Sequence, residues 1–324
     1  MSEREVHIVQ GSVVGPRRCR DFDFAFWVLA QKTRQARHEP SDRESSERQV
    51  AIVTGGSSGI GLAIAKALAA AGVSVALVAR SSAALQAAAK AVQAAGSAGT
   101  RVIALPADVT DERAVAWVVE ETDRQLGPVD VLVNNAGSSS ALGPIWEVEP
   151  DAWWHDVTVN LRGTFLCARS VLPGMITRRR GRIINIASLF GIQNTLGIEP
   201  SPYASGYSSS KAGVLILTRH LATTTHAYGI SAFAISPGWV RTALTDHMMQ
   251  SEAGQRWLPE VATSYAAGRD GSPERAVQLV MYLVSGQADK LSGRCIRAQC
   301  DVSAMVRDAE SIRGENRNVL QFYE

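Results

Sequence analysis

The residues with the clearest chemistry are a tyrosine and a lysine that stand one helical turn apart. Tyr207 and Lys211 enclose three serines, and a spacing of four residues puts both side chains on one face of a helix. A free phenol has a pKa of about 10, so lowering it to about 7 takes roughly 4 kcal/mol. One ammonium about 4 Å away supplies that much at an effective dielectric constant of ~20. The spacing predicts a tyrosine that works as an acid and base, although two exposed helix residues would fit it too.

A second chemical signal is a glycine-rich turn between an apolar run and an alanine-rich stretch. The turn reads Thr-Gly-Gly-Ser-Ser-Gly-Ile-Gly over residues 54–61. Glycines let the backbone approach a pyrophosphate closely, and the first turn of the next helix offers unpaired N–H groups to the anion. The stricter Gly-x-Gly-x-x-Gly pattern is absent, because Ile64 stands where a third glycine or alanine is expected. The prediction of a dinucleotide site therefore rests on the position of the turn between a predicted strand and a predicted helix.

The end of the second predicted strand bears on the choice of dinucleotide. Dinucleotide-binding folds usually place an acid there for the ribose 2′-hydroxyl of NAD. This chain has Arg80 followed by Ser81, and a guanidinium pairs with a 2′-phosphate that a carboxylate would repel. The charge favours NADP(H) over NAD(H), and the alternative is a solvated arginine at a strand end.

Several motifs, in their order along the chain, resemble the short-chain dehydrogenase/reductase family. These motifs are the turn 54–61, Asn134-Asn135-Ala136-Gly137, Ser188, Tyr207 and Lys211. The likeness is to the compact single-domain branch and covers about residues 49–302. It implies an NAD(P)-dependent enzyme that interconverts a ketone or aldehyde and an alcohol by hydride transfer, in a direction that the sequence does not select.

The resemblance also implies a role for each matching residue. The catalytic residues are Asn160, which holds a water of the proton relay, Ser188, which orients the substrate carbonyl, the acid and base Tyr207, and Lys211, which lowers the tyrosine pKa and holds the nicotinamide ribose. The predicted cofactor contacts are Thr54, Gly55, Ser57, Ser58, Gly59, Ile60, Gly61, Arg80, Ser81, Asp108, Val109, Asn135, Ala136, Gly137, Tyr207, Lys211, Pro237, Gly238, Val240 and Thr242.

The chain departs from the family pattern at two places. Ser188 and Tyr207 are 19 positions apart, several more than usual, so we expect a loop insertion beside the substrate pocket that includes Gly197, Pro200, Pro202 and Tyr203. Ser58 stands where NADP-preferring members often have a basic residue, which weakens the argument from Arg80.

The substrate is expected to be largely apolar. Residues 239–268 take the place of the family's mobile substrate loop and include Leu244, Met248, Met249, Trp257 and Leu258, while Trp146, Phe190 and Ile192 are expected near the same cleft. Such side chains also serve as packing. The histidines His155, His220, His226 and His247 have no catalytic spacing and are interpreted as surface or structural residues. Among them, His247 is the one candidate for lining the pocket.

Short apolar runs alternate with helical stretches from residue 49 onward, which predicts a doubly wound parallel β-sheet of about seven strands with helices on both faces. The predicted strands are Val50–Thr54, Val73–Ala79, Arg101–Leu105, Val129–Asn134, Arg182–Ala187, Ser231–Ser236 and Arg294–Ala298. The predicted helices lie near 59–71, 82–95, 111–125, 151–177, 206–228 and 273–285. We expect a loosely ordered N-terminal extension over 1–48, a Rossmann-like catalytic domain over 49–302 and a C-terminal tail over 303–324.

Composition limits the remaining possibilities. With 33 Lys and Arg against 31 Asp and Glu, the 324-residue chain has a net charge of +2, so electrostatics indicate neither a nucleic acid nor a membrane surface as partner. No apolar run approaches the ~18 residues of a membrane-spanning helix. The four cysteines are scattered without metal-ligand spacing, which predicts no metal site and favours the cytoplasm. The resemblance implies a homodimer or homotetramer, with the long helices pairing across subunits.

Two alternatives to an NADP(H)-dependent enzyme stay open. One is an NAD-dependent alcohol dehydrogenase with the same relay. The other is a regulatory protein that binds a dinucleotide without turnover, which we would expect to lack one of Ser188, Tyr207 and Lys211, and this chain has all of them.

Overall fold

The seven apolar runs form seven strands in the computed structural model, which describes residues 48–190, 202–268 and 271–319. Each strand lies within two residues of its predicted bounds. β-Branched and other apolar side chains fill both faces, so every residue of β1 and β6 is buried. The strands are β1 (Val50–Thr54), β2 (Ser74–Ala79), β3 (Val102–Pro106), β4 (Val131–Asn134), β5 (Gly181–Ile186), β6 (Ile230–Ser236) and β7 (Cys295–Arg297).

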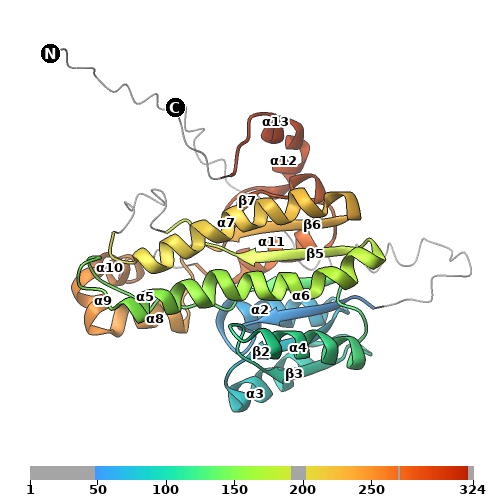
Figure 1. The fold of residues 1–324 in the computed structure, drawn as a ribbon, viewed down its shortest axis with the longest axis horizontal. Coiled ribbons are helices and arrows are strands. Elements are labelled where there is room, and N and C mark those ends of the chain that lie inside the picture. Colours follow the sequence, from blue (N-terminus) through green and yellow to red (C-terminus); the bar gives the residue numbers. More distant parts are fainter. Residues whose placement is uncertain (1–47, 191–201, 269–270, 320–324) are drawn as a thin grey trace, which may run out of the picture. The chain divides into compact units, whose positions relative to one another are not determined.

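All strand pairs are parallel, and the strands lie in the order β3-β2-β1-β4-β5-β6-β7 (Figure 1). The chain runs outward from β1 to β3, then returns and runs outward again from β4. The two halves of the sheet therefore start at β1 and β4 and extend in opposite directions. Doubly wound sheets leave a crevice between two such strands, at their carboxyl ends. The predicted fold class is confirmed.

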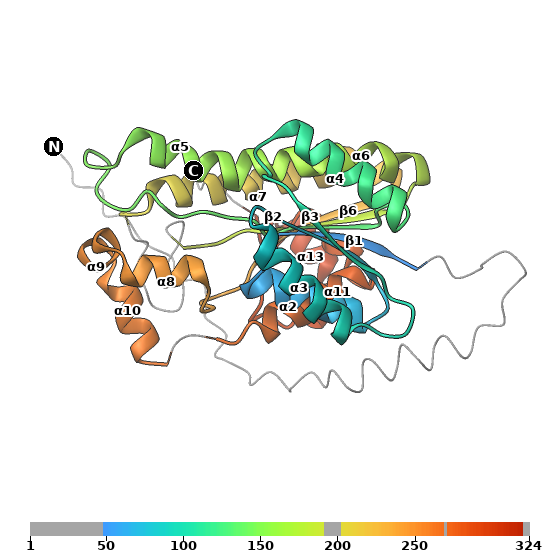
Figure 2. The same ribbon diagram turned by 90° about the horizontal axis from the view of Figure 1, so that it is seen from below.

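Helices cover both faces of the sheet (Figure 2). On one face lie α2 (Gly59–Ala70), α3 (Ser82–Ala95) and α11 (Glu274–Val284), and on the other lie α4 (Glu112–Gln125), α5 (Pro150–Val157), α6 (Gly163–Arg178) and α7 (Ser205–Thr225). No helix in 48–190, 202–268 or 271–319 is both long and apolar enough to cross a membrane.

The predicted helix 151–177 changes from α-helical to π-helical and back, and no sequence pattern predicts this change. Between α5 and α6 the segment Thr158–Arg162 is π-helical, and Asn160 lies inside it. π-Helical turns are rare and often occur at functional sites, because the extra residue changes the direction in which side chains point. Here the turn directs the Asn160 side chain inward, where it is completely buried.

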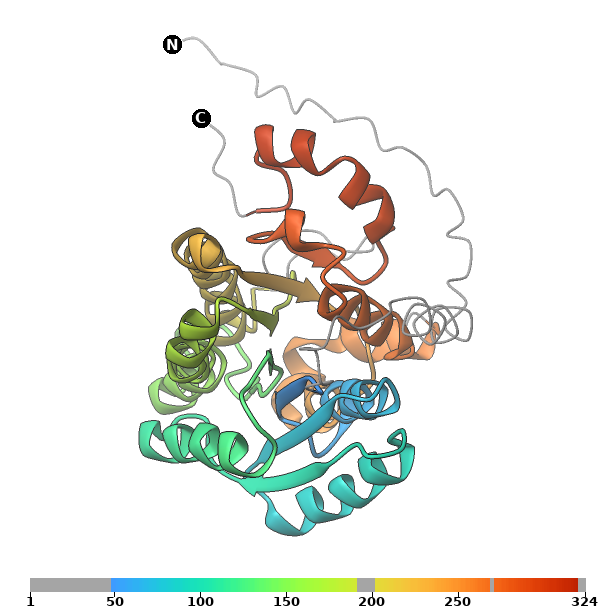
Figure 3. The same cartoon turned by 90° about the vertical axis from the view of Figure 1, so that its right-hand side faces the viewer.

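Two stretches that the sequence analysis left without regular elements are helical. Residues 239–268 contain α8 (Ala243–Gln250), α9 (Glu252–Trp257) and α10 (Pro259–Ala266). The predicted C-terminal tail begins with α12 (Val302–Arg307) and α13 (Ala309–Gly314), seen in dark red in Figure 3. Ile312 of α13 is only 2% exposed, and the backbone N–H of Cys295 in β7 donates to the carbonyl of Asn318 at 2.7 Å. The described part of this segment is therefore packed against the fold.

Some expectations concern residues outside the described ranges. These are the extension over residues 1–47, most of the loop insertion, including Gly197 and Pro200, the expected cleft residue Ile192, and the last residues of the C-terminal tail.

Candidate active site

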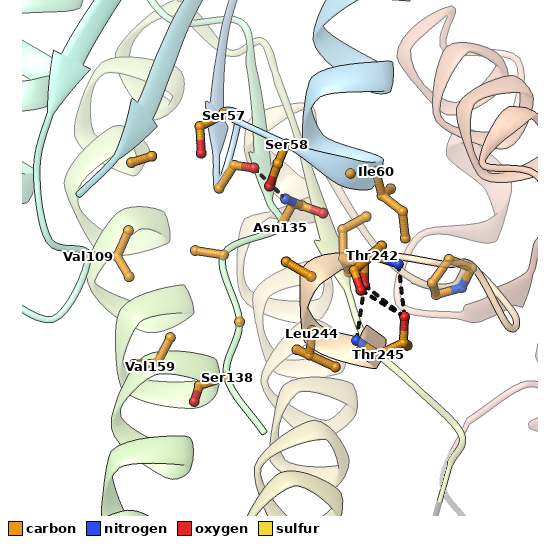
Figure 4. A pocket seen from close by; sticks show the side chains of 18 of the residues that line it. Ser57, Ser58, Ile60, Val109, Asn135, Ser138, Val159, Thr242, Leu244 and Thr245 are labelled. Atoms are coloured by element: carbon orange, nitrogen blue, oxygen red, sulfur yellow. Dashed lines mark hydrogen bonds between the residues drawn. The ribbon is translucent and has the colours of Figure 1, made fainter. Parts of the chain in front are cut away.

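A cavity of about 810 Å³ lies at the carboxyl ends of the strands. Segments that follow β1, β2, β3, β4, β5 and β6 all contribute to its wall, as expected for the crevice of a doubly wound sheet. In Figure 4, Ser57 and Ser58 lie at one side and Thr242, Leu244 and Thr245 at another. The predicted site residues that line the cavity are Gly55, Ser57, Ser58, Gly59, Ile60, Arg80, Ser81, Asp108, Val109, Asn135, Ala136, Gly137, Ser188, Tyr207, Lys211, Pro237, Gly238, Val240 and Thr242.

The glycine-rich turn opens the N-terminus of α2 toward this cavity. Gly59 has a φ of +54°, a conformation that side chains rarely adopt. Ser58 is the N-cap residue of α2, and its side chain makes no capping hydrogen bond, so the first N–H groups of the helix are left for a ligand. This arrangement fits the phosphates of a dinucleotide.

Two predicted cofactor contacts, Thr54 and Gly61, do not line the cavity and instead shape the turn from behind. The Thr54 hydroxyl accepts hydrogen bonds from the backbone N–H groups of Asn135 (3.0 Å) and Ala136 (3.1 Å). The Asn135 side chain donates in return to the carbonyls of Thr54 (3.0 Å) and Gly55 (3.1 Å). A Cβ on Gly61 would lie 2.4 Å from the Gly55 carbonyl oxygen, so close packing requires a glycine there.

Charged side chains gather where the segments after β2 and β3 meet the cavity wall. Asp108 accepts hydrogen bonds from the backbone N–H (2.9 Å) and hydroxyl (2.8 Å) of Thr110. Burial raises the pKa of Asp108, but the Thr110 hydrogen bonds and the charges of Arg80 and His155 lower it more, so the net shift is downward. Arg80 is exposed at this rim and available to an anionic ligand.

The interpretation of the histidines needs a correction. His155 of α5 lines the cavity, whereas His247 is exposed on α8 and does not. His155 is itself exposed, as expected of a surface residue, and it lies at the edge of the cavity.

Tyr207 is nearly buried, with 9% of its surface exposed, and the Ser188 side chain lies near its phenol. The Ser188 hydroxyl accepts a hydrogen bond from the backbone N–H of Phe190 at 3.1 Å. Burial raises the pKa of Tyr207, the nearby Ser188 side chain lowers it in part, and the charges of Asp156 and the Tyr265 phenol raise it. The net shift is upward, so the phenol is protonated at neutral pH.

The pKa of Tyr207 is raised in this structure, although its spacing to Lys211 predicts a lowered one. The Lys211 Nζ lies 5.8 Å from the centre of the Tyr207 ring and donates to the Ile186 carbonyl at 2.7 Å. Burial also lowers the pKa of Lys211 to about 8, because an ammonium is poorly solvated there. The spacing placed both groups on one helix face, but burial outweighs their mutual attraction.

Asn160 lies behind the cavity wall. Its Oδ1 accepts from the backbone N–H of Ser138 (2.8 Å), and its Nδ2 donates to the Ser138 carbonyl (2.8 Å) and the Ser210 hydroxyl (2.9 Å). The Ser210 hydroxyl donates to the Tyr207 carbonyl at 2.6 Å. Asn160 thus connects the π-helical turn, the segment after β4 and α7.

Apolar side chains surround the buried side of Tyr207. It packs in a cluster with Leu142, Ala204, Met248, Leu258 and Val261. The Phe190 ring lies 6.5 Å from the Tyr207 ring and 5.4 Å from that of Trp239. Leu244 lines the cavity itself, whereas Trp146, expected near the cleft, is 81% exposed.

Sequence reasoning missed several residues of the cavity wall. Ser138, His155, Val159 and Thr245 line it as well. Ser138 and Val159 directly adjoin the predicted residues Gly137 and Asn160, so their position was a usable signal. Thr245 closes a capping box with Thr242 at the start of α8, with its hydroxyl 2.8 Å from the Thr242 backbone N (Figure 4).

Comparisons with known proteins agree with this geometry. The family model described as short chain dehydrogenase matches residues 49–253. A short chain dehydrogenase of Pseudocercospora fijiensis is 34% identical over 273 residues, which are 82% of this chain and 85% of that protein. A 2-dehydro-3-deoxy-L-rhamnonate dehydrogenase (NAD(+)) of a Sphingomonas species is 35% identical, over 72% of this chain and 87% of that protein.

A solved structure extends the likeness to three dimensions. The structure of an actinorhodin polyketide ketoreductase variant with NADPH superposes with a TM-score of 0.67 at 31% identity, covering 77% of this chain and 95% of that one. The fold, the crevice and these matches agree with one another. The chain therefore belongs to the short-chain dehydrogenase/reductase family and is an NAD(P)-dependent oxidoreductase of alcohol and ketone substrates.

Proposed function

We propose that the protein is an NADP(H)-dependent oxidoreductase that interconverts a ketone or aldehyde and an alcohol through Ser188, Tyr207, Lys211 and Asn160. The observation that carries the proposal is a buried, protonated Tyr207 that lines the same cavity as Ser188, Lys211 and the open N-terminus of α2. A phenol kept protonated by burial can donate a proton to a substrate oxygen, which supports the reductive direction.

Each of these side chains has a distinct task in the proposed reaction. Ser188 and Tyr207 hydrogen-bond to the carbonyl oxygen and hold it in place, and Tyr207 donates its proton to that oxygen as negative charge develops there. When bound, the nicotinamide supplies the hydride to the carbonyl carbon. The Lys211 ammonium stabilises the tyrosinate that remains, and Asn160 fixes the backbone around the relay through Ser138 and Ser210.

The preference for NADP(H) rests on Arg80. It lines the cavity beyond the end of β2, and the hydroxyl-bearing residues Ser57 and Ser58 line the cavity as well. The Ser81 hydroxyl caps α3 by accepting a hydrogen bond from the Ala84 N–H at 3.5 Å, so only part of its hydrogen-bonding capacity is left for a cofactor. The NADPH bound by the related ketoreductase supports this choice, and the NAD(+) named for the Sphingomonas relative keeps NAD as the alternative.

We propose that the substrate is largely apolar and that the enzyme assembles in the cytoplasm as a homodimer or homotetramer. The cluster around Tyr207 and the cavity-lining Leu244 support the first point. Trp154 on α5 and Phe165 on α6 are 60% and 46% exposed, which supports helix pairing between subunits. The free, buried thiols of Cys167 and Cys295 fit a reducing compartment.

The decisive experiment is a panel of ketones, aldehydes and alcohols assayed with NADPH and NADH on wild type and Tyr207→Phe. We expect turnover in the wild type and a loss of about 10²–10⁴-fold or more in the variant, the usual contribution of a general acid. NADPH binding, measured by fluorescence titration, should be retained. Tyr228→Phe, at a position that is 41% exposed, is the matched control and should behave as wild type. Full activity in Tyr207→Phe would refute the mechanism.

Cofactor choice is tested with Arg80→Ala. If the guanidinium pairs with the 2′-phosphate, the affinity for NADPH should fall about 10–100-fold, the loss of a charge-assisted hydrogen bond, while the affinity for NADH changes little. Lys90→Ala removes an exposed cation of α3 outside the cavity and serves as the control. Equal affinities for the two cofactors in wild type, unchanged by Arg80→Ala, would contradict the preference.

A further inference from the structure

We propose that Asp156 is a positioning residue of the active site, which holds the segment Ser138–Ala141 through its carboxylate and thereby sets where Ser138 and Leu142 lie beside the reactants. This inference rests on the proposed function, because it concerns the same site. Asp156 belongs to α5, has no exposed surface and carries no feature of the predicted motifs.

Within the described residues, the side-chain hydrogen bonds of Asp156 all come from one short segment. Its carboxylate accepts hydrogen bonds from the Ser138 hydroxyl (2.7 Å), the Ser140 backbone N–H (2.8 Å), the Ser140 hydroxyl (2.9 Å) and the Ala141 backbone N–H (3.1 Å). Buried carboxylates are usually paired with a cation. Within the described ranges Asp156 has no ion pair, so these four donors stabilise its charge instead.

The segment that Asp156 holds reaches both sides of the reaction site. Ser138 lines the cavity (Figure 4), and Leu142 packs with Tyr207 in the apolar cluster. Asn160 stands one turn after Asp156 in the same continuous helix and binds the backbone of Ser138 in both directions. The two side chains therefore fix the segment together, Asn160 at its start and Asp156 along its length.

The charge of Asp156 also acts on the proposed proton donor. The titratable groups that face Tyr207 are Asp156 from α5, Tyr265 from α10 and Lys211 from its own helix. The carboxylate of Asp156 raises the pKa of Tyr207, since a nearby negative charge disfavours the phenolate. A neutral replacement should remove both the anchor of the segment and this electrostatic effect.

The experiment compares wild type with Asp156→Asn, which keeps the size of the side chain and removes its charge. Asp151→Asn, at an exposed position in the first turn of α5, is the matched control. We expect kcat/KM for carbonyl reduction to fall about 10–100-fold in Asp156→Asn, with KM raised as well as kcat lowered because the segment adjoins the reactants. Asp151→Asn should stay within twofold of wild type.

Two further readouts need no turnover. Hydrogen exchange of the Ser140 and Ala141 amides should be faster in Asp156→Asn, since both lose a charged acceptor. Phenolate absorbance, taken as each protein minus its Tyr207→Phe version, should titrate at lower pH in Asp156→Asn than in wild type. If wild type reduces no carbonyl, the proposed function fails, and these two readouts still decide the role of Asp156.

A kcat/KM within twofold of wild type, unchanged amide exchange or an unmoved phenol titration in Asp156→Asn would each overturn the proposal. If Asp156→Asn does not fold, the double variant Ser138→Ala/Ser140→Ala takes its place, because it removes two of the donors and leaves the carboxylate. That variant should lose activity and exchange the Ala141 amide faster. Wild-type behaviour in both measurements would overturn the proposal as well.

Discussion

At the scale of single residues, burial controls the protonation of the proposed relay more than the pairing of charges does. Tyr207 and Lys211 shift in opposite directions, and in each case the main cause is the loss of water around the charged form. The tyrosine is thereby kept as an acid, and the lysine is brought within reach of losing its proton near physiological pH.

The pKa of Lys211 leads to a prediction for the pH dependence of carbonyl reduction. Since burial lowers this pKa to about 8, kcat/KM should be highest below that value and fall as the pH rises through it, because the neutral amine no longer stabilises the tyrosinate. Tyr207, with its raised pKa, stays protonated over this range and causes no loss of its own.

Lys211→Arg identifies the group responsible for that fall. A guanidinium stays charged in proteins, so the residual activity of this variant should no longer decline near pH 8. The measurement is kcat/KM from pH 5.5 to 10 (about two units either side of the expected midpoint) for both proteins. A decline at the same pH in Lys211→Arg would assign it to another group.

At the scale of elements, two local devices hold the site. One is the π-helical turn Thr158–Arg162, which turns Asn160 inward between Ser138 and Ser210. The other is the pair of hydrogen bonds between Thr54 and Asn135, which joins the glycine-rich turn to the end of β4. Thr54 and Asn160 themselves lie behind the cavity wall, so their effect on ligands is indirect.

The tight packing of the turn makes Gly61→Ala a sharp test. The new Cβ would lie 2.4 Å from the Gly55 carbonyl oxygen and 2.4 Å from the Asn135 side-chain nitrogen, which forces the backbone of the turn to move. Overpacking of this kind costs about 1–3 kcal/mol, so we expect a lower Tm and cofactor affinity reduced about tenfold or more.

Gly314→Ala is the control for this variant. Nothing lies within 4 Å of the position its Cβ would take at the end of α13, so both Tm and cofactor affinity should be close to wild type. Scanning calorimetry and fluorescence titration measure the two quantities. If Gly61→Ala matched Gly314→Ala in both, the turn would be more tolerant than its contacts indicate.

At the scale of the whole molecule, the described C-terminal segment completes the β7 edge of the sheet. Ala309 and Ile312 are both 2% exposed, and the carbonyl of Asn318 binds the backbone of β7. The stability of the catalytic fold therefore includes residues beyond the predicted domain boundary at 302.

Ile312→Ala tests this contribution. Removing a buried isoleucine side chain typically costs about 2–5 kcal/mol, so the free energy of unfolding in urea should fall by that amount. Arg313→Ala, at the next, exposed position, should be nearly neutral. Turnover by folded protein should be unchanged in both, since α13 contributes nothing to the cavity wall. An Ile312→Ala protein as stable as wild type would mean that the segment is peripheral.

The sequence was sufficient for the seven strands and for the helices that alternate with them along the chain as far as β6, because apolar runs and helical periodicity are local properties of the chain. The turn 54–61 and the pair Tyr207 and Lys211 were visible for the same reason. Only the tertiary structure decided the protonation of that pair, the π-helical turn at Asn160, the place of His155 at the cavity and the contacts of Asp156. Each of these depends on burial and on charges from segments far apart in the chain, which a spacing between neighbours does not contain.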